Sequence, residues 1–228
     1  MHRPANAAGI PPRTAWFRLR AAVTFSLAAL AASASPSAQP LPTLGPLDAS
    51  GRVSYFIEDG EPGSTYMPAD RELATWALKA WERVSNGRIR FEQGSRADAL
   101  VQVHWVPAGG GQYGEMRPVR VGGRRGAAVY IRPDTNGLGP DIAAAAKQDP
   151  LLRDTIVYLT CVHEIGHALG LPHTDDFRDI MYFFGFGGDI PAFFGRYRVG
   201  LRTRSDIAGT AGLSEADIER LRELYSAR

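Results

Sequence analysis

Eleven consecutive residues decide how this chain folds and what it does: His163-Glu164-Ile165-Gly166-His167-Ala168-Leu169-Gly170-Leu171-Pro172-His173. The spacing H-E-x-x-H places His163 and His167 one turn apart on a helix, so that both imidazoles project from the same face. Two neutral imidazoles on one face can bind one metal ion without distortion of the backbone. Glu164 lies beside the first of them, where its carboxylate can reach a water molecule on that metal. The stretch therefore predicts a zinc site with its general base in place.

The second glycine of this stretch predicts how a third ligand arrives. Gly170 lets the chain leave the helix through a left-handed residue, a conformation that other residues adopt only at a cost. That turn can bring His173 back toward the helix. Three histidines leave the fourth position of a zinc ion open for water, which is the arrangement of a catalytic rather than a structural zinc. The sequence thus predicts one catalytic zinc ion, bound by His163, His167 and His173.

The remaining histidines do not suggest a second cluster. The chain has only five histidines, and three of them lie in this stretch. His104 falls in a predicted strand, residues 99–106, and the sequence near it holds no acid or histidine cluster. We therefore interpret His104 as structural, with a second metal site there as the alternative.

The eleven residues resemble the zinc-binding stretch of the metzincin metallopeptidases, and the residues after them narrow the resemblance to matrixins of a bacterial type. Met181, in Asp179-Ile180-Met181-Tyr182, is similar to the Met-turn that underlies the metal in that clan; the alternative is an ordinary buried methionine. Thr174 stands where matrixins usually carry a serine. Residues 213–225 resemble the closing helix of matrixin catalytic domains. The resemblance covers about residues 50–228.

The resemblance implies an α+β, zincin-like catalytic domain. Such a domain has a twisted mixed β-sheet, an active-site helix and a C-terminal helix, arranged as two lobes around a cleft. The hydrophobic periodicity of this chain independently predicts its elements: strands at 52–57, 89–92, 99–106, 115–121 and 127–131, and helices at 70–85, 154–169 and 214–225.

Some features of the resembled families do not transfer to this chain. Matrixins carry a second zinc bound by several histidines, and those histidines are absent here. Calcium binding by Asp134, Asn136 or Asp141 is possible in principle, but their spacing does not support it. Astacins and serralysins place a zinc-contacting tyrosine two residues after the Met-turn methionine, where this chain has Phe183. Tyr182 fits the matrixin pattern better.

The N-terminus predicts where the protein works. Arginines precede an apolar run at residues 21–32, and Ala32-Ser33-Ala34 supplies a small-x-small cleavage site. A dozen apolar residues are too few for a permanent membrane span. We therefore predict a signal peptide at 1–34, with a second possible cut after residue 38 and an uncleaved anchor as the alternative. Residues 35–51 form a Pro/Ser-rich linker, residues 52–228 form the peptidase domain, and the mature protein is secreted or periplasmic.

Charge and cysteine content narrow the function further. Residues 1–38 hold four arginines and no acid, so the rest of the chain has 22 bases against 24 acids. Neither a nucleic-acid partner nor stable membrane insertion follows from that balance. The single cysteine, Cys161, should point away from the zinc face and be buried. Matrixin zymogens usually hold a pro-segment cysteine against the zinc, but this sequence has no cysteine before Cys161. We therefore expect no latency segment of that kind here.

The resemblance also predicts how substrate binds. An extended peptide would add as a further strand beside residues 115–121, which explains how a protease holds many sequences. Four arginines near this strand either favour acidic substrates or, more simply, protect a solvated edge; they are Arg117, Arg120, Arg124 and Arg125. The glycine-rich stretches at 109–114 and 122–126 lack the lysine and helix of a phosphate loop. Aromatic residues at 183–197 either line an apolar pocket or pack the lower lobe, and the sequence does not decide between these.

Three functions remain compatible with the sequence. The first is a secreted, monomeric zinc endopeptidase that hydrolyses extended polypeptide, with Glu164 taking a proton from the attacking water. The second is a processing peptidase of narrow specificity. The third is a zinc-containing binding module with weak catalysis, against which the retention of Glu164 argues.

Overall fold

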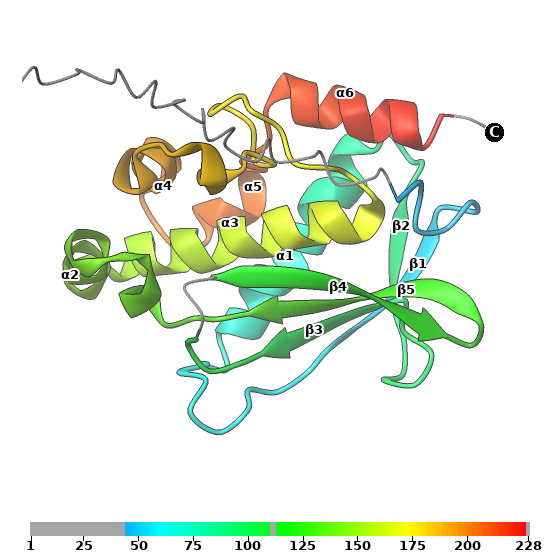
Figure 1. The fold of residues 1–228 in the computed structure, drawn as a ribbon, viewed down its shortest axis with the longest axis horizontal. Helices are drawn as coiled ribbons and strands as arrows, with labels where there is room; N and C mark the ends of the chain where they lie inside the picture. Colours follow the sequence, from blue (N-terminus) through cyan, green and yellow to red (C-terminus); the bar gives the residue numbers. More distant parts are fainter. Residues whose placement is uncertain (1–43, 110–112, 227–228) are drawn as a thin grey trace, which may run out of the picture. The chain divides into compact units, whose positions relative to one another are not determined.

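A five-stranded mixed sheet forms the base of the fold in the computed structural model, which describes residues 44–109 and 113–226 (Figure 1). The strands are β1 (Arg52–Ile57), β2 (Arg90–Gln93), β3 (Val101–Trp105), β4 (Gly114–Val121) and β5 (Arg124–Ile131). Their order across the sheet is β2-β1-β3-β5-β4. All neighbours run parallel except β4, which is antiparallel to β5 and ends the sheet on that side.

Two helices cover one face of this sheet and form the core with it. They are α1 (Asp70–Val84) and α3 (Pro150–Leu169), which pack against each other while α3 also contacts β4 and β5. Alternation along β3 explains why one face is apolar, since Val101, Val103 and Trp105 are fully buried whereas the residues between them are partly exposed. Helix α3 thus lies between the sheet and the segment that follows it (Figure 1). This arrangement confirms the predicted α+β class.

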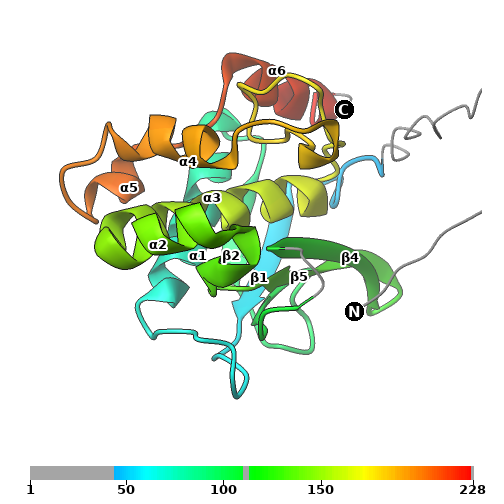
Figure 2. The same cartoon turned by 60° about the vertical axis from the view of Figure 1, so that its left-hand side comes forward.

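The other helices lie around α3 (Figure 2). Their bounds are η1 (Thr135–Leu138), α2 (Pro140–Gln148), η2 (Phe184–Phe186), α4 (Ile190–Arg198), α5 (Asp206–Gly209) and α6 (Glu215–Leu224). Helix α6 begins with a capping box, in which Ser214 and Asp217 each bond the other's backbone N–H. Within residues 44–109 and 113–226, no helix is both long and apolar enough to cross a membrane.

The structure moves two predicted boundaries by three residues or more and adds helices that were not predicted. Helix α3 starts at Pro150 rather than Asp154, because Asp149 accepts from the N–H groups of Leu151 and Leu152 and a proline occupies the first turn. Strand β5 starts at Arg124 rather than residue 127. Gly122 and Gly123 form a two-residue turn, so pairing between β4 and β5 begins directly beside it, at Val121 and Arg124. Helices α2, α4 and α5 were not predicted, although α2 begins with Pro140 and α4 has Pro191 as its second residue.

The predicted signal peptide and most of the predicted linker lie outside the described residues. The described part of the linker, residues 44–51, packs on the domain rather than leading freely into it. The N–H of Leu47 donates to the Tyr225 hydroxyl (3.0 Å), and the Arg125 guanidinium donates to the carbonyl of Gly45 (2.8 Å).

Candidate metal centre and active site

Helix α3 carries two of the predicted ligands, and their backbone contacts fix which nitrogen each presents. The Nδ1–H of His163 donates to the carbonyl of Ile180 (2.6 Å), and the Nδ1–H of His167 donates to the carbonyl of Leu171 (2.9 Å). A carbonyl only accepts, so Nδ1 carries the proton and Nε2 keeps its lone pair. Both Nε2 atoms are therefore in the state that a metal ligand requires.

Gly166 and Gly170 lie so close to neighbouring groups that a side chain at either position would collide with them. Gly170 ends α3 in the left-handed conformation (φ +112°), as predicted, and a side chain there would collide with the carbonyl oxygen of Gly45. At Gly166, a Cβ would lie 2.5 Å from the sulfur of Met181. Met181 is fully buried and lies against the helix at the turn that carries the histidines. This position is the one that the Met-turn interpretation predicts.

A short ladder of backbone hydrogen bonds places His173. The N–H of Thr174 donates to the carbonyl of Met181 (2.8 Å), and the N–H of Phe183 donates to the carbonyl of Thr174 (3.1 Å). The ring of Phe183 lies 4.7 Å, centroid to centroid, from the His173 ring. Thr174 is thus hydrogen-bonded to the Met-turn through both its N–H and its carbonyl. These two bonds hold the neighbouring His173 close to α3.

The three histidines converge on one point. The Nε2 of His173 lies 3.0 Å from the Nε2 of His167 and 3.3 Å from the Nε2 of His163. Tetrahedral zinc, with histidine nitrogens at about 2.0–2.1 Å, holds two of them about 3.3 Å apart. Lone pairs this close repel one another unless a cation lies between them. In the described part of the chain, this is the one group of histidines, cysteines and acids able to hold a metal ion.

Burial keeps these imidazoles neutral. It lowers the pKa of His163 well below its ordinary value and, with the neighbouring His167, lowers the pKa of His173 to about 4. The pKa of His167 is lowered for the same reason. Because a ligand must be unprotonated, the site is ready for a metal throughout the neutral range.

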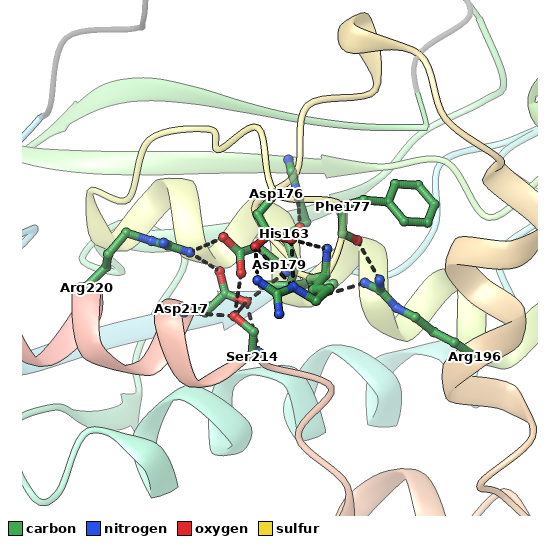
Figure 3. Close-up of polar contacts among 10 residues, drawn as sticks. His163, Asp176, Phe177, Asp179, Arg196, Ser214, Asp217 and Arg220 are labelled. Atoms are coloured by element: carbon green, nitrogen blue, oxygen red, sulfur yellow. Dashed lines mark hydrogen bonds and ion pairs between the residues drawn. The ribbon is translucent and has the colours of Figure 1, made fainter.

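A buried polar network from α6 supports the Met-turn beneath His163 (Figure 3). The N–H of Ile180 donates to the carboxylate of Asp217 (2.8 Å), which is fully buried. The Arg220 guanidinium donates to both Asp217 (2.8 Å) and Asp179 (2.6 Å), and the Ser214 hydroxyl donates to Asp179 (2.6 Å). The peptide at Ile180 is therefore held by Asp217 on its N–H while its own carbonyl holds a histidine. The C-terminal helix is connected to the predicted metal ligand in two steps.

Glu164 faces the opposite side, toward β4. It is 6% exposed, and a Cβ at Gly114 would lie 2.6 Å from its Oε1. The backbone N–H of Met116 donates to the carboxylate. Burial raises the pKa of Glu164 to about 8 and the charge of Glu115 adds to the rise, whereas the Met116 hydrogen bond and Arg132 oppose it. A dication at the histidines would lower that pKa toward the ionised form that a base needs.

An apolar cleft of about 610 Å³ opens beside these groups. Residues of β4 line one side of the cleft, residues of the segment after Gly170 line the other, and α3 contributes His163, Glu164 and His167. Four of the six aromatic residues that the sequence left undecided line it: Phe183, Phe184, Phe193 and Phe194. Phe193 and Phe194 are also buried in the core, so both interpretations of this segment hold in part. Phe186 is largely exposed, and Tyr197 instead stacks on Tyr158.

Comparison with known proteins gives the family. The family model described as Matrixin matches residues 49–186, which hold all three histidines and Met181. This chain belongs to the matrixin family. The predicted resemblance and the zincin-like fold are thereby confirmed, and membership indicates a zinc-dependent metallopeptidase.

A curated matrixin relative is the macrophage metalloelastase of the rabbit, Oryctolagus cuniculus. It is 24% identical to this chain over 132 residues, which are 57% of this chain and 27% of the relative. The chain therefore matches only about a quarter of the relative's length. The relationship is distant, and the elastase activity in the relative's name belongs to that protein.

Residues that the sequence placed outside the matrixin site are accounted for by structural contacts. His104 Nδ1 lies 2.9 Å from the carboxylate of Glu58, and its ring stacks on Tyr130. Asp134 accepts from the N–H of Asn136 at the start of η1, which is a helix-capping contact. Cys161 is fully buried, as predicted, and burial raises the pKa of its thiol.

The four arginines near β4 are likewise engaged within the matrixin domain. Arg117 pairs with Glu115 (2.7 Å), Arg124 pairs with Asp48, and Arg120 donates to the carbonyl of Gly123. Arg125 holds the carbonyl of Gly45. These contacts favour the protective interpretation over recognition of acidic substrates.

Sequence reasoning did not find three residues that shape this site. Gly114 and Gly166 adjoin Glu164 and Met181, but nothing in the sequence says which glycine meets which side chain. Asp217 belongs to the S-x-x-D pattern of residues 214–217, which is typical of a helix cap, but its hydrogen bond to Ile180 has no signal in the sequence. The S-x-x-D pattern gave its place on the helix, whereas the second contact depends on tertiary packing.

Proposed function

We propose that the protein is a secreted zinc endopeptidase that hydrolyses peptide bonds within extended polypeptide chains. One observation carries the proposal. Three imidazole nitrogens meet at one point, and a buried carboxylate, that of Glu164, lies beside the same cleft. Three histidines with an open fourth position, next to a carboxylate that is not a ligand, make a catalytic rather than a structural arrangement.

The proposed mechanism assigns each residue one task. A zinc ion held by His163, His167 and His173 would polarise the scissile carbonyl and lower the pKa of a bound water. Glu164 takes the proton of the attacking water and then delivers it to the departing amine. Gly114 leaves the space in which the Glu164 carboxylate lies. Gly170 and Met181 hold the histidines in place without touching the substrate.

The substrate is proposed to bind as an added strand beside β4. Among the described residues that strand has a partner, β5, on one side only, so its outer backbone groups, apart from the Met116 N–H directed to Glu164, remain available to an extended peptide. Side chains of such a peptide would enter the apolar cleft, whose lining is mostly aliphatic and aromatic. A monomer suffices, because all of these groups come from one chain.

The place of action is also part of the proposal. The predicted leader at 1–34 supports export, to the periplasm or beyond, with the mature chain beginning near residue 35 or 39. N-terminal sequencing of protein recovered from outside the cytoplasm checks this. Material that still begins at residue 1 would contradict cleavage.

The decisive test is hydrolysis of a denatured protein by the exported full-length product, with and without a chelator. We expect fragments from the zinc-loaded enzyme, none after chelation, and recovery when zinc is restored. Elemental analysis should find about one zinc per chain. Cleavage of many sequences in a peptide library supports the general endopeptidase, whereas cleavage of very few supports a narrow processing peptidase. Zinc binding without turnover supports the weakly catalytic binding module.

A further inference from the structure

Helix α4 contacts both the cleft and the loop that follows the third predicted metal ligand. Its Phe193 lines the cleft and is buried. The ring of Phe193 also lies 5.5 Å, centroid to centroid, from the ring of Phe177. Phe177 belongs to the loop of residues 174–180, which joins His173 to Met181. The loop and the lining of the cleft therefore meet at one aromatic contact.

Arg196, three residues beyond Phe193 on α4, binds the same loop. Its Nη1 donates to the carbonyl of Phe177 (2.5 Å), and its Nη2 donates to the carbonyl of Arg178 (3.1 Å). The carbon of the guanidinium lies 4.3 Å from the centre of the Phe193 ring and 5.4 Å from that of the Phe177 ring. Both distances are within the range of cation–π attraction. One side chain thus contacts the backbone of the loop and both rings that join the loop to the cleft.

Two helices hold this loop, and Figure 3 shows Arg220 and Arg196 reaching it from opposite sides. From α6, Asp217 accepts from the N–H of Ile180, and Arg220 donates to Asp179. From α4, Arg196 donates to the two carbonyls at 177–178. Within the described part of the chain, α4 contributes residues to the lining of the cleft and α6 does not. The contact made by Arg196 is therefore the one that connects the loop to the surface where a substrate would bind.

We propose that Arg196 is a positioning residue, which fixes the aromatic lining of the cleft against the loop that follows His173. This inference rests on the proposed function. A planar guanidinium can donate to two successive carbonyls and stack on rings at the same time, whereas a lysine ammonium is a single point charge. Without these contacts the loop would hold His173 less firmly, and Phe193 would no longer lie at a fixed distance from the metal site. The competing explanation is that Arg196 only stabilises the fold.

Arg196→Met and Arg196→Lys test the metal side of this connection. Arg196 is exposed, so neither variant opens the core. Methionine keeps a long apolar side chain but donates no hydrogen bond, and lysine keeps the charge but cannot reproduce the planar fork. For Arg196→Met, we expect zinc affinity to fall by roughly 2- to 10-fold, the effect of one exposed hydrogen bond or cation–π contact. Arg196→Lys should fall between Arg196→Met and the wild type. Competition with a chromophoric chelator measures both.

The substrate side is tested with two peptides of one cleavable sequence, which carry either leucine or alanine beside the scissile bond. Only the leucine side chain is long enough to depend on the placement of the aromatic lining. At saturating zinc, Arg196→Met should raise KM for the leucine peptide by roughly 2- to 10-fold and leave kcat within about 2-fold. KM for the alanine peptide should stay near the wild-type value. A fall in kcat with unchanged KM would refute the proposed role.

Arg198→Met is the matched control, because Arg198 lies two residues further along the same helix and faces other partners. It pairs with Asp149 (2.8 Å) and donates to the carbonyl of Leu201 (2.9 Å). We expect this variant to lower the melting temperature and to leave zinc affinity and the difference between the peptides unchanged. If Arg196→Met behaves in the same way, Arg196 serves stability alone and the proposal is wrong. A change in only one of the two measurements would also refute the connection. If the methionine variant does not fold, the lysine variant carries the same comparison.

Binding separates this inference from the proposed function. The two peptides are titrated against zinc-loaded Glu164→Gln protein, with and without Arg196→Met, and Kd is followed by fluorescence anisotropy. A selective loss of affinity for the leucine peptide, together with weaker zinc binding, supports the inference even if the wild-type protein turns over no peptide. Unchanged affinities for zinc and for both peptides refute it even if the protein proves to be an active peptidase.

Discussion

The cleft has two walls, strand β4 and the Met-turn segment, and they differ in the groups that they contain. The β4 wall presents main-chain groups of an exposed edge, and Glu164 lies against it. The Met-turn wall, residues 174–183, contributes the side chains of Ile180, Tyr182 and Phe183 to the cleft, and hydrogen bonds to the buried carboxylates of Asp179 and Asp217 hold it in place. The β4 wall is therefore suited to handle the substrate and the proton, and the Met-turn wall to hold the metal.

The difference predicts separable phenotypes. Changes on the β4 wall should lower turnover while zinc is retained. Changes on the Met-turn wall should weaken zinc retention first, and activity as a consequence. Each variant below is therefore assessed by two measurements, peptide hydrolysis and zinc content.

Glu164→Gln should have the largest effect. It keeps the size of the side chain but cannot accept the proton of the water, and general acid–base catalysis contributes roughly 10²–10⁴ in rate. We expect kcat to fall by at least that factor while zinc content and melting temperature stay near wild type. Persistent activity would place the base elsewhere. Loss of zinc along with activity would mean that Glu164 supports metal binding. The prediction that changes on the β4 wall spare zinc would then be wrong.

Gly114→Ala tests the β4 wall without changing a reacting group. The new Cβ would lie 2.6 Å from Glu164 Oε1 and 2.7 Å from a methyl carbon of Thr160, so the carboxylate has to move. A displacement on the order of 1 Å can cost about 10²-fold in rate. We expect kcat to fall by about 10- to 100-fold with zinc retained.

Gly137→Ala is the matched control for that change. A Cβ there meets nothing within 4 Å, and its backbone is not left-handed. It should leave kcat within about 2-fold of wild type, since ordinary surface substitutions have small effects. Equal kinetics for the two alanine variants would mean that Gly114 does not constrain Glu164.

Asp217→Ala tests the other wall. It leaves the buried N–H of Ile180 without its acceptor, and the Ile180 carbonyl is the partner of His163. Loss of a residue that supports a metal ligand typically weakens metal affinity 10- to 100-fold, and an unsatisfied buried group costs about 1–3 kcal/mol of stability.

Competition with a chromophoric chelator and thermal unfolding measure these two effects. Glu219→Ala, on the exposed side of the same helix, should change neither. If excess zinc fully restores kcat to Asp217→Ala, the Met-turn wall acts through the metal, as proposed. If kcat stays low in the zinc-saturated variant, that wall also shapes the reaction.

The sequence predicted the metal-facing half of this site far better than the substrate-facing half. His163, His167 and Gly170 follow one another within one helix and its C-terminal cap, so their spacing determines their geometry, whereas His173 also depends on the backbone hydrogen bonds between Thr174 and the Met-turn. Met181 needed the family resemblance, because a lone methionine carries no pattern. The helix observed at Asp70–Val84 was predicted at residues 70–85 from the same kind of local pattern.

What the sequence could not give depends on contacts between distant segments. Gly114 meets Glu164 across fifty residues, and Asp217 meets Ile180 across thirty-seven. Helix α3 was predicted to start too late because Asp149 and Pro150 were not recognised as its beginning.

The smallest expected effect belongs to Phe183, whose ring lies 4.7 Å from that of His173. Phe183→Leu keeps the position apolar but removes the ring contact, and aromatic pairs contribute about 0.5–1.5 kcal/mol beyond their buried area. We expect zinc affinity to fall by roughly 2- to 10-fold, with kcat unchanged once the site is saturated. Phe186→Leu is the matched control, because that exposed ring contacts Phe183 but makes no ring contact with His173. A drop in kcat at saturating zinc for Phe183→Leu alone would show that this part of the Met-turn wall touches the substrate. Only residues 174–182 would then act on the metal alone.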